Sequence, residues 1–404
     1  MVKPVYIWRM NHPRWILPTI VFSQFCCTSL WFAGNGVMND LVQDFGLEAN
    51  AIGHLTSAVQ VGFIIGTLLF AVLTLTDRFS PARVFLVCAG FGALFNSLII
   101  VEGNTLTSIL GCRLLTGFFL AGIYPVGMKI AADYYEKGLG KSLGFLVGAL
   151  VVGTAFPHLL KGLTGTISWR LVLTTTSALA VLGGLLMVAL VPDGPYRKPG
   201  STVDFAACFS VFKKREFRAA AFGYFGHMWE LYAFWAFVPI MLVTYQEAHP
   251  SVALNIPLLS FIIIAIGGPA CVVSGYVSLA RGPRPTALVA LQLSGLCCLL
   301  SPLVLSTASS GVFVFFLMVW GTVVIADSPL FSTLVAQQAP VASRGTALTI
   351  VNGIGFSVTI VSIQLINEMR ETVGPYYVYL LLALGPMAGW RALYQRTRQT
   401  PSAV

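Results

Sequence analysis

Runs of about 20 predominantly apolar residues recur along almost the whole chain, and this pattern constrains the fold more than any other feature. A run of this length crosses the hydrocarbon core of a bilayer as one α-helix, because each helical residue rises about 1.5 Å. Of all residues, 56% are hydrophobic and only 10% are charged, whereas soluble domains carry about 25% charged residues. The sequence therefore predicts an all-α integral membrane protein.

We expect twelve transmembrane helices. The first apolar run, 15–38, follows basic residues as a signal peptide does, but it is too long and lacks an A-x-A cleavage site, so we expect it to be retained as a helix. The other spans are expected at 53–76, 84–101, 106–128, 142–160, 171–191, 219–243, 256–279, 285–306, 311–334, 346–366 and 374–390.

The distribution of basic residues predicts the orientation. The chain has 24 Lys and Arg residues and a net charge of +9. With the N-terminus inside, only Lys161, Arg170 and Arg370 lie outside, and Arg113 lies within a span. Because cytoplasmic loops carry the excess of basic residues, both termini are predicted to be cytoplasmic in a cell (inner) membrane. This bias also accounts for the positive charge, so we expect contact with lipid and no nucleic-acid partner.

An internal repeat organises the chain. At an offset of about 204 residues, Trp31 falls on Trp235 and Pro125 on Pro329, each at the same place in the order of spans. We therefore predict two pseudo-symmetric six-helix bundles, with an N-terminal bundle over 1–192 and a C-terminal bundle over 219–404. The longest polar stretch, 193–218, is the expected cytoplasmic linker.

Polar side chains concentrate in spans one, four, seven and ten, which hold the same positions in each half of the repeat. Span one carries Gln24, Trp31 and Asn35 at helical spacing, so they share one face. This distribution predicts a cavity between the two repeats, because only the helices that line such a cavity need polar faces. We assign six residues to this cavity: Gln24, Trp31, Asn35, Arg113, Tyr124 and Trp235.

Ionisable side chains inside the spans are the candidates for ion coupling. Glu230 lies near the middle of span seven, where hydrocarbon favours the protonated carboxyl and thus suits proton uptake and release, with a structural buried hydrogen bond as the alternative. His227 and Asp327 are further candidates, with a satisfied interior histidine and a helix-capping contact as the alternatives. Arg113 is either an anion contact, the partner of a carboxylate, or an arginine that bonds to a neighbouring helix.

Two motifs resemble those of the major facilitator superfamily. The residues from Leu75 to Arg83 are similar to the family's loop between helices two and three, with Ser80 where glycine is usual and Pro81 where a basic residue is usual. The residues from Arg113 to Gly117 resemble its helix-four motif. The resemblance implies two six-helix bundles that rock about a central site, with Asp77 and Arg78 in conformational gating. It identifies no substrate subfamily.

These observations favour a secondary active transporter that moves a small solute by alternating access, with protons or another ion as the coupling partner. The alternative is a non-transporting membrane sensor or a membrane-embedded enzyme on the same scaffold. An enzyme needs a nucleophile and base, or metal ligands, at one depth, and no such set stands in the sequence. We expect no enzymatic activity, no cofactor, no metal site and a monomer.

Overall fold

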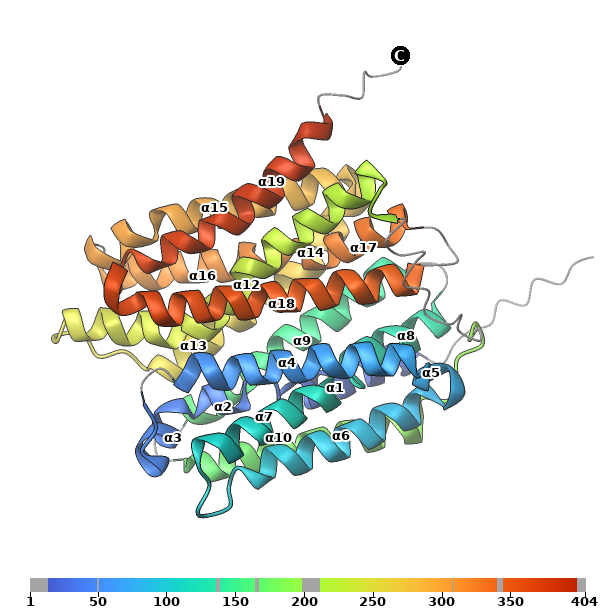
Figure 1. The fold of residues 1–404 in the computed structure, drawn as a ribbon, viewed down its shortest axis with the longest axis horizontal. Helices are drawn as coiled ribbons and strands as arrows, with labels where there is room; N and C mark the ends of the chain where they lie inside the picture. Colours follow the sequence, from blue (N-terminus) through green and yellow to red (C-terminus); the bar gives the residue numbers. More distant parts are fainter. Residues whose placement is uncertain are drawn as a thin grey trace, which may run out of the picture.

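The fold of the chain was analysed in a computed structural model (Figure 1). It describes residues 14–48, 51–135, 139–163, 167–197, 211–307, 309–339 and 344–397. Half of the predicted linker, residues 198–210, therefore lies outside the described residues. We call residues up to 197 the N-terminal half and residues from 211 the C-terminal half.

The described residues form long helices that run roughly parallel through the molecule (Figure 1). Seven are continuous, and their bounds are α4 (Ala51–Val72), α6 (Pro81–Leu98), α9 (Leu139–Gly162), α10 (Trp169–Leu190), α12 (Arg215–Ala248), α15 (Pro283–Thr307) and α18 (Arg344–Val373). The short α5 (Leu75–Arg78) follows α4. We call the end that holds α5 the linker side, and the end that holds the start of α4 the opposite side.

Five of the predicted spans are interrupted. They comprise α1 (Ile16–Thr28), α2 (Ala33–Gly36) and α3 (Met38–Phe45); α7 (Leu106–Leu120) and α8 (Tyr124–Tyr134); α13 (Ile256–Ala265) and α14 (Gly267–Arg281); α16 (Ser310–Ala326) and α17 (Ser328–Gln338); and the 3₁₀ segment η2 (Val378–Ala383) with α19 (Leu384–Thr397). Pro125 and Pro329 stand at the second position of α8 and α17. Proline cannot supply the backbone N–H that would continue the preceding helix, which places both breaks.

Ten helices of the described chain are long and apolar enough to cross a membrane, when α7 with α8, α13 with α14, and α16 with α17 are each taken as one span. The prediction of twelve spans differs at the two ends. The first span is not one helix from 15 to 38, because α1 ends at Thr28, so its apolar helix is shorter. The last begins as a 3₁₀ segment and ends in the polar α19. Large apolar side chains such as Leu279 and Phe315 are exposed on the outside of the bundle, as expected of a surface that meets lipid.

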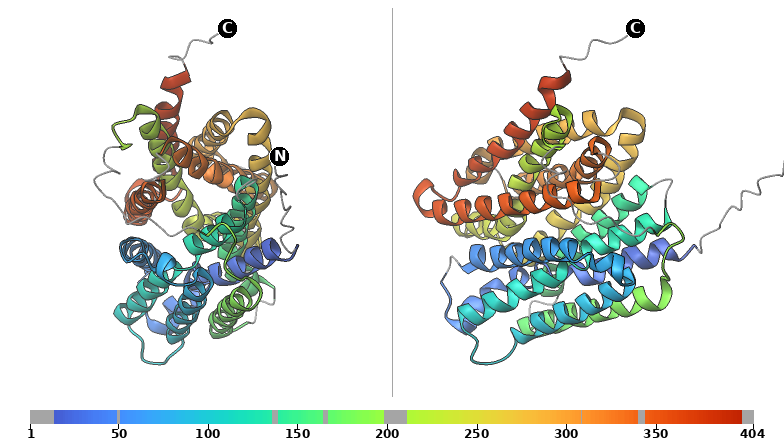
Figure 2. Two further views of the ribbon diagram at one scale, coloured as in Figure 1. Left: turned by 90° about the vertical axis from the view of Figure 1, so that its right-hand side faces the viewer. Right: turned by 45° about the vertical axis from the view of Figure 1, so that its right-hand side comes forward.

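The two halves form separate groups of helices (Figure 2). They meet where α4 packs on α18 and where α9 packs on α13 and α14. Hydrogen bonds between the halves join Gln364 Nε2 to Ser57 Oγ at 2.8 Å and Asn255 Nδ2 to the carbonyl of Gly162 at 3.1 Å. Both bonds lie toward the opposite side, so the halves are tied together there.

Candidate functional site

The interruption of the first span lies at the centre of the site. Between α1 and α2 the backbone hydrogen bonds shorten to the i→i+3 pattern, with Trp31 N donating to the carbonyl of Thr28 at 3.0 Å. Gly34 and Gly36 follow directly and disfavour a continuous helix. The carbonyls of this turn therefore need donors from elsewhere, because lipid supplies none.

Arg113 supplies those donors. Its side chain is fully buried, and its guanidinium donates to the carbonyl of Leu30 at 3.1 Å, to that of Trp31, and to Asn96 Oδ1 at 3.5 Å. The cation thus meets partial negative charges of the backbone at the break. Of the alternatives for Arg113, this geometry favours the arginine that bonds to a neighbouring helix. A contact with substrate or with a carboxylate stays a prediction.

Six aromatic side chains fill the interface between the halves beside the break. The indole of Trp31 stacks on Tyr232 at 5.8 Å and on Phe356 at 5.7 Å between ring centroids. The indole Nε1 atoms of Trp31 and Trp235 are buried and have no hydrogen-bond partner among the described residues. We call this set the aromatic cluster, and its members are Trp31, Phe32, Phe63, Tyr232, Trp235 and Phe356.

The aromatic cluster brings together two predicted cavity residues, Trp31 and Trp235. A third, Tyr124, is the first residue of α8 and is half-buried. It packs against the buried core that contains Tyr224 and Tyr232 of α12. This surface between the halves offers aromatic rings, phenol hydroxyls and two free indole N–H donors, which suit a small planar or polar solute.

Gln24 and Asn35 lie apart from the aromatic cluster. A Cβ added at Gly127 would come within 2.2 Å of Gln24 Oε1, so the amide of Gln24 points at α8 inside the N-terminal half. Asn35 instead lies toward the opposite side, where its Nδ2 donates to Thr56 Oγ1 at 2.8 Å. The single polar face predicted for span one is therefore divided, because the turn after Thr28 changes the direction in which later side chains point.

Glu230 lies inside the C-terminal half. Its side chain is 1% exposed, and Oε1 accepts hydrogen bonds from Trp320 Nε1 at 2.6 Å and from Cys298 Sγ at 3.2 Å. These donors stand on α16 and α15, so the carboxyl is held between three helices. Both are neutral groups, and neither balances a carboxylate charge.

His227 and Asp327 form a second buried pair nearby. His227 Nδ1 lies 2.7 Å from Asp327 Oδ1, and both side chains are 1% exposed. His227 stands one turn before Glu230 on α12, and Asp327 stands at the break between α16 and α17. The three residues predicted for proton coupling are thus gathered on one side of the C-terminal half, away from Arg113.

The predicted gating residues lie on the linker side. Asp77 forms an ion pair with Lys129 on α8, and the guanidinium of Arg197 donates to the carbonyl of Phe79 at 2.8 Å. Arg78 instead donates to Thr74 Oγ1 at 3.2 Å within its own loop. The loop after α4 is thereby tied to α8 and to the residues that follow α10.

Sequence reasoning missed several residues that complete these groups. Lys129, Cys298 and Trp320 supply partners to predicted residues, and their signal was weak because nothing in the surrounding sequence relates them to those partners. His158 was not among the predicted site residues, yet its buried ring lines a cavity on the opposite side. The other residues that line this cavity come from α9 itself and from five other helices, an arrangement that no local spacing reveals.

The helical bundle, its buried ionisable groups and the interface between its halves define a multi-pass membrane protein of the transporter class rather than an enzyme. The family model of the Major Facilitator Superfamily matches residues 20–363, and the chain belongs to this family.

Relatives and solved structures agree with this placement. A nitrate/nitrite transporter of Picosynechococcus sp. is 24% identical over 52% of this chain and 44% of its own length. A 4-hydroxybenzoate transporter of Pseudomonas aeruginosa is 30% identical over 40% of this chain and 34% of its own length. The chain thus spans about half or less of the length of these relatives. A bacterial homologue of the human lysosomal transporter Spinster shares the fold, with a TM-score of 0.73 and 14% identity over 96% of this chain and 98% of its own.

Proposed function

We propose that this protein is a proton-coupled secondary active transporter that moves small acid anions across the membrane by alternating access. The observation that carries the proposal is the buried carboxyl of Glu230, whose hydrogen-bond donors Trp320 and Cys298 are neutral. A carboxylate without a balancing cation is costly in this setting, so Glu230 favours the protonated form when water is excluded. Access of water from one side then lets the proton leave to that side.

The substrate class rests on chemistry that some relatives share. Three are named as transporters of nitrate or nitrite, of 4-hydroxybenzoate and of gallate. These solutes are anions at neutral pH, and two are aromatic carboxylates. The free indole N–H donors of Trp31 and Trp235 and the rings beside them suit a small acid with a planar body. A proton that travels with such an anion offsets its charge, which joins the substrate class to the coupling ion.

The gating proposal follows from contacts on the linker side. The ion pair of Asp77 with Lys129 joins the loop between α4 and α6 to α8. We assign to this pair the stabilisation of one conformation of the linker side. The transporter is assigned to act as a monomer, because each chain holds both halves of the central interface.

The experiment that tests the function is uptake into proteoliposomes. Purified protein is reconstituted, and labelled nitrate and 4-hydroxybenzoate are offered with and without a pH gradient that is acid outside. We expect one of these anions to accumulate only with the gradient, and a protonophore to abolish the accumulation. Empty liposomes are the control, since weak acids also cross lipid unaided. Equal uptake with and without the gradient contradicts the proton coupling, and no uptake above empty liposomes contradicts the substrate class.

The orientation gives a separate prediction. Basic residues stand mostly in segments of the linker side, which is therefore assigned to the cytoplasm. A reporter fused at Ser201 should be active only as a cytoplasmic reporter, and one fused at Pro250 only as an external one. Paired enzymatic and fluorescent reporters at both positions make the measurement. The reverse pair of results assigns the linker side to the exterior.

A further inference from the structure

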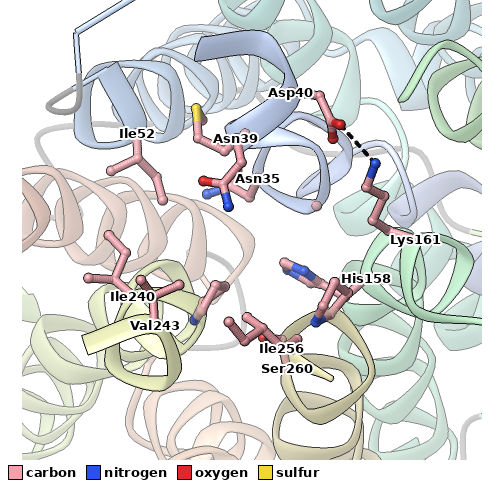
Figure 3. A pocket seen from close by; sticks show the side chains of 14 residues that line it. Asn35, Asn39, Asp40, Ile52, His158, Lys161, Ile240, Val243, Ile256 and Ser260 are labelled. Atoms are coloured by element: carbon pink, nitrogen blue, oxygen red, sulfur yellow. Dashed lines mark hydrogen bonds and ion pairs between the residues drawn. The ribbon is translucent and has the colours of Figure 1, made fainter. Parts of the chain in front are cut away.

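A cavity of about 90 Å³ opens on the opposite side, between the two halves (Figure 3). Its two walls differ in chemistry. The wall from the N-terminal half is mostly polar, with Met38 and Ile52 as apolar members, and the wall from the C-terminal half is mostly apolar. The polar wall consists of Asn35, Asn39, Asp40, His158 and Lys161, and the apolar wall of Pro239, Ile240, Val243, Ile256 and Pro257.

His158 is the most informative residue of the polar wall. Its side chain is 2% exposed, and Nε2 has no hydrogen-bond partner among the described residues. Figure 3 shows the imidazole projecting from α9 into the cavity, toward the side that carries Asn35 and Asn39. A buried ring nitrogen without a hydrogen-bond partner lowers the stability of the fold, because it has lost its bonds to water and gained none in return. The cavity therefore holds an unused hydrogen-bonding group that points at its contents.

The charges around His158 balance. Lys161 Nζ lies 2.8 Å from Asp40 Oδ1, so the ammonium and the carboxylate cancel at the rim. The remaining polar groups of this wall, Asn35 and Asn39, carry no charge. A ligand that arrives with a single uncompensated charge therefore leaves the cavity charged, whereas a net-neutral ligand does not.

We propose that this cavity binds a small monocarboxylic acid together with its proton, with the carboxyl group on His158 and the apolar body on the C-terminal wall. The proton lies either on the acid oxygen or on Nε2 of the imidazole, and in both cases the pair carries no net charge. This inference rests on the proposed function, for which it provides a receiving site on the opposite side. A simple ammonium compound leaves a positive charge in the cavity and is disfavoured.

The size of the cavity sets the size of the acid. A single buried water needs about 10–15 Å³ of such space, so a cavity of about 90 Å³ admits a small acid, and propionate is a suitable probe. Ile240 and Val243 on α12 face the polar wall and suit its ethyl group. Because the walls come from different halves, an acid bound here contacts both halves at once.

Ligand protection of a cysteine tests the site without any need for turnover. The Val243→Cys variant is placed in nanodiscs, where both faces are open to a hydrophilic maleimide, and wild-type protein gives the background from native cysteines. Propionate at about nine times its dissociation constant should slow labelling about ten-fold, because only the free fraction reacts. Propionamide and propylamine should leave the rate unchanged.

Variants of the polar wall decide whether His158 is responsible. In the Val243→Cys background, His158→Leu should remove the protection by propionate. His54→Leu, a half-buried histidine on α4 that does not line the cavity, should keep it. Asn39→Asp is an exposed change that adds a negative charge to the rim, and it should weaken protection even if His158→Leu fails to fold.

Three outcomes overturn the site. In the first, propionate does not slow the labelling of Val243→Cys. In the second, it slows labelling in the His158→Leu and Asn39→Asp variants as much as in Val243→Cys alone. Protection by propylamine in place of propionate also overturns it. A protein that shows protection but no gradient-driven uptake would contradict the proposed function and leave this site standing, so the two failures are distinguishable.

Discussion

Glu230→Gln is expected to abolish gradient-driven accumulation of substrate while exchange of substrate across the membrane continues. The amide has the shape of the carboxyl, and its oxygen still accepts hydrogen bonds from Trp320 and Cys298. The packing between α12, α15 and α16 is therefore preserved, and only the titrating proton is lost. Uptake against a gradient and exchange at equal concentrations, measured in the same proteoliposomes, separate the two effects.

Glu247→Gln is the matched control for this experiment. It is the same substitution on the same helix, but Glu247 is exposed at the opposite end of α12. We expect it to leave both accumulation and exchange unchanged. If Glu230→Gln accumulates substrate at the wild-type rate under a pH gradient, Glu230 does not carry the coupling proton, and the buried pair of His227 and Asp327 becomes the candidate.

Arg113→Ala is expected to destabilise the whole protein and to reduce accumulation and exchange together. The variant leaves the carbonyls of Leu30 and Trp31 and the amide of Asn96 without their buried donor. The variant no longer has to bury a charged guanidinium, but the loss of its charged hydrogen bonds outweighs that gain. We therefore expect a decrease of about 2–5 kcal/mol in the free energy of unfolding. Thermal unfolding of the purified variant, followed by size-exclusion fluorescence, makes the measurement.

The chain offers a control and a clear alternative for Arg113. Arg170 is half-exposed and lies 3.6 Å from Asp44, so Arg170→Ala should cost less than about 1 kcal/mol. Arg113→Lys keeps a charge but loses the planar fork that reaches both carbonyls. A stable Arg113→Lys protein with a changed KM and normal unfolding would show that Arg113 contacts substrate and does not chiefly hold the break.

Most of the fold was predictable because each membrane span is a continuous apolar segment of the sequence. Apolar runs of about 20 residues predicted the continuous helices, and the repeat paired Pro125 with Pro329, but the breaks that these prolines explain were not predicted. The break after Thr28 was missed. It depends on Arg113, which stands 82 residues from Trp31 in sequence, and on glycines whose individual effect is small.

The candidate site was predictable in part for the same reason. Burial of Glu230, His227 and Asp327 followed from their positions in apolar spans, and the contact of His227 with Asp327 brings two of the predicted residues together. The directions in which the polar side chains of the first span point did not follow from the sequence. Helical spacing assigned Gln24, Trp31 and Asn35 to one face, but the turn between α1 and α2 distributes them over three environments.

Pro125 and Pro329 stand at equivalent positions of the two halves, and this bears on the origin of the chain. Breaks at the same position of both halves are what duplication of one six-helix unit leaves behind, so the interrupted helix is a shared inheritance. The ionisable residues are not shared. Arg113 stands where the second copy has Leu317, and Glu230 stands where the first copy has Cys26. The two halves thus share a scaffold but differ in their ionisable residues. The first half holds the cation that bonds to its broken helix, and the second half holds the acids proposed to carry the proton.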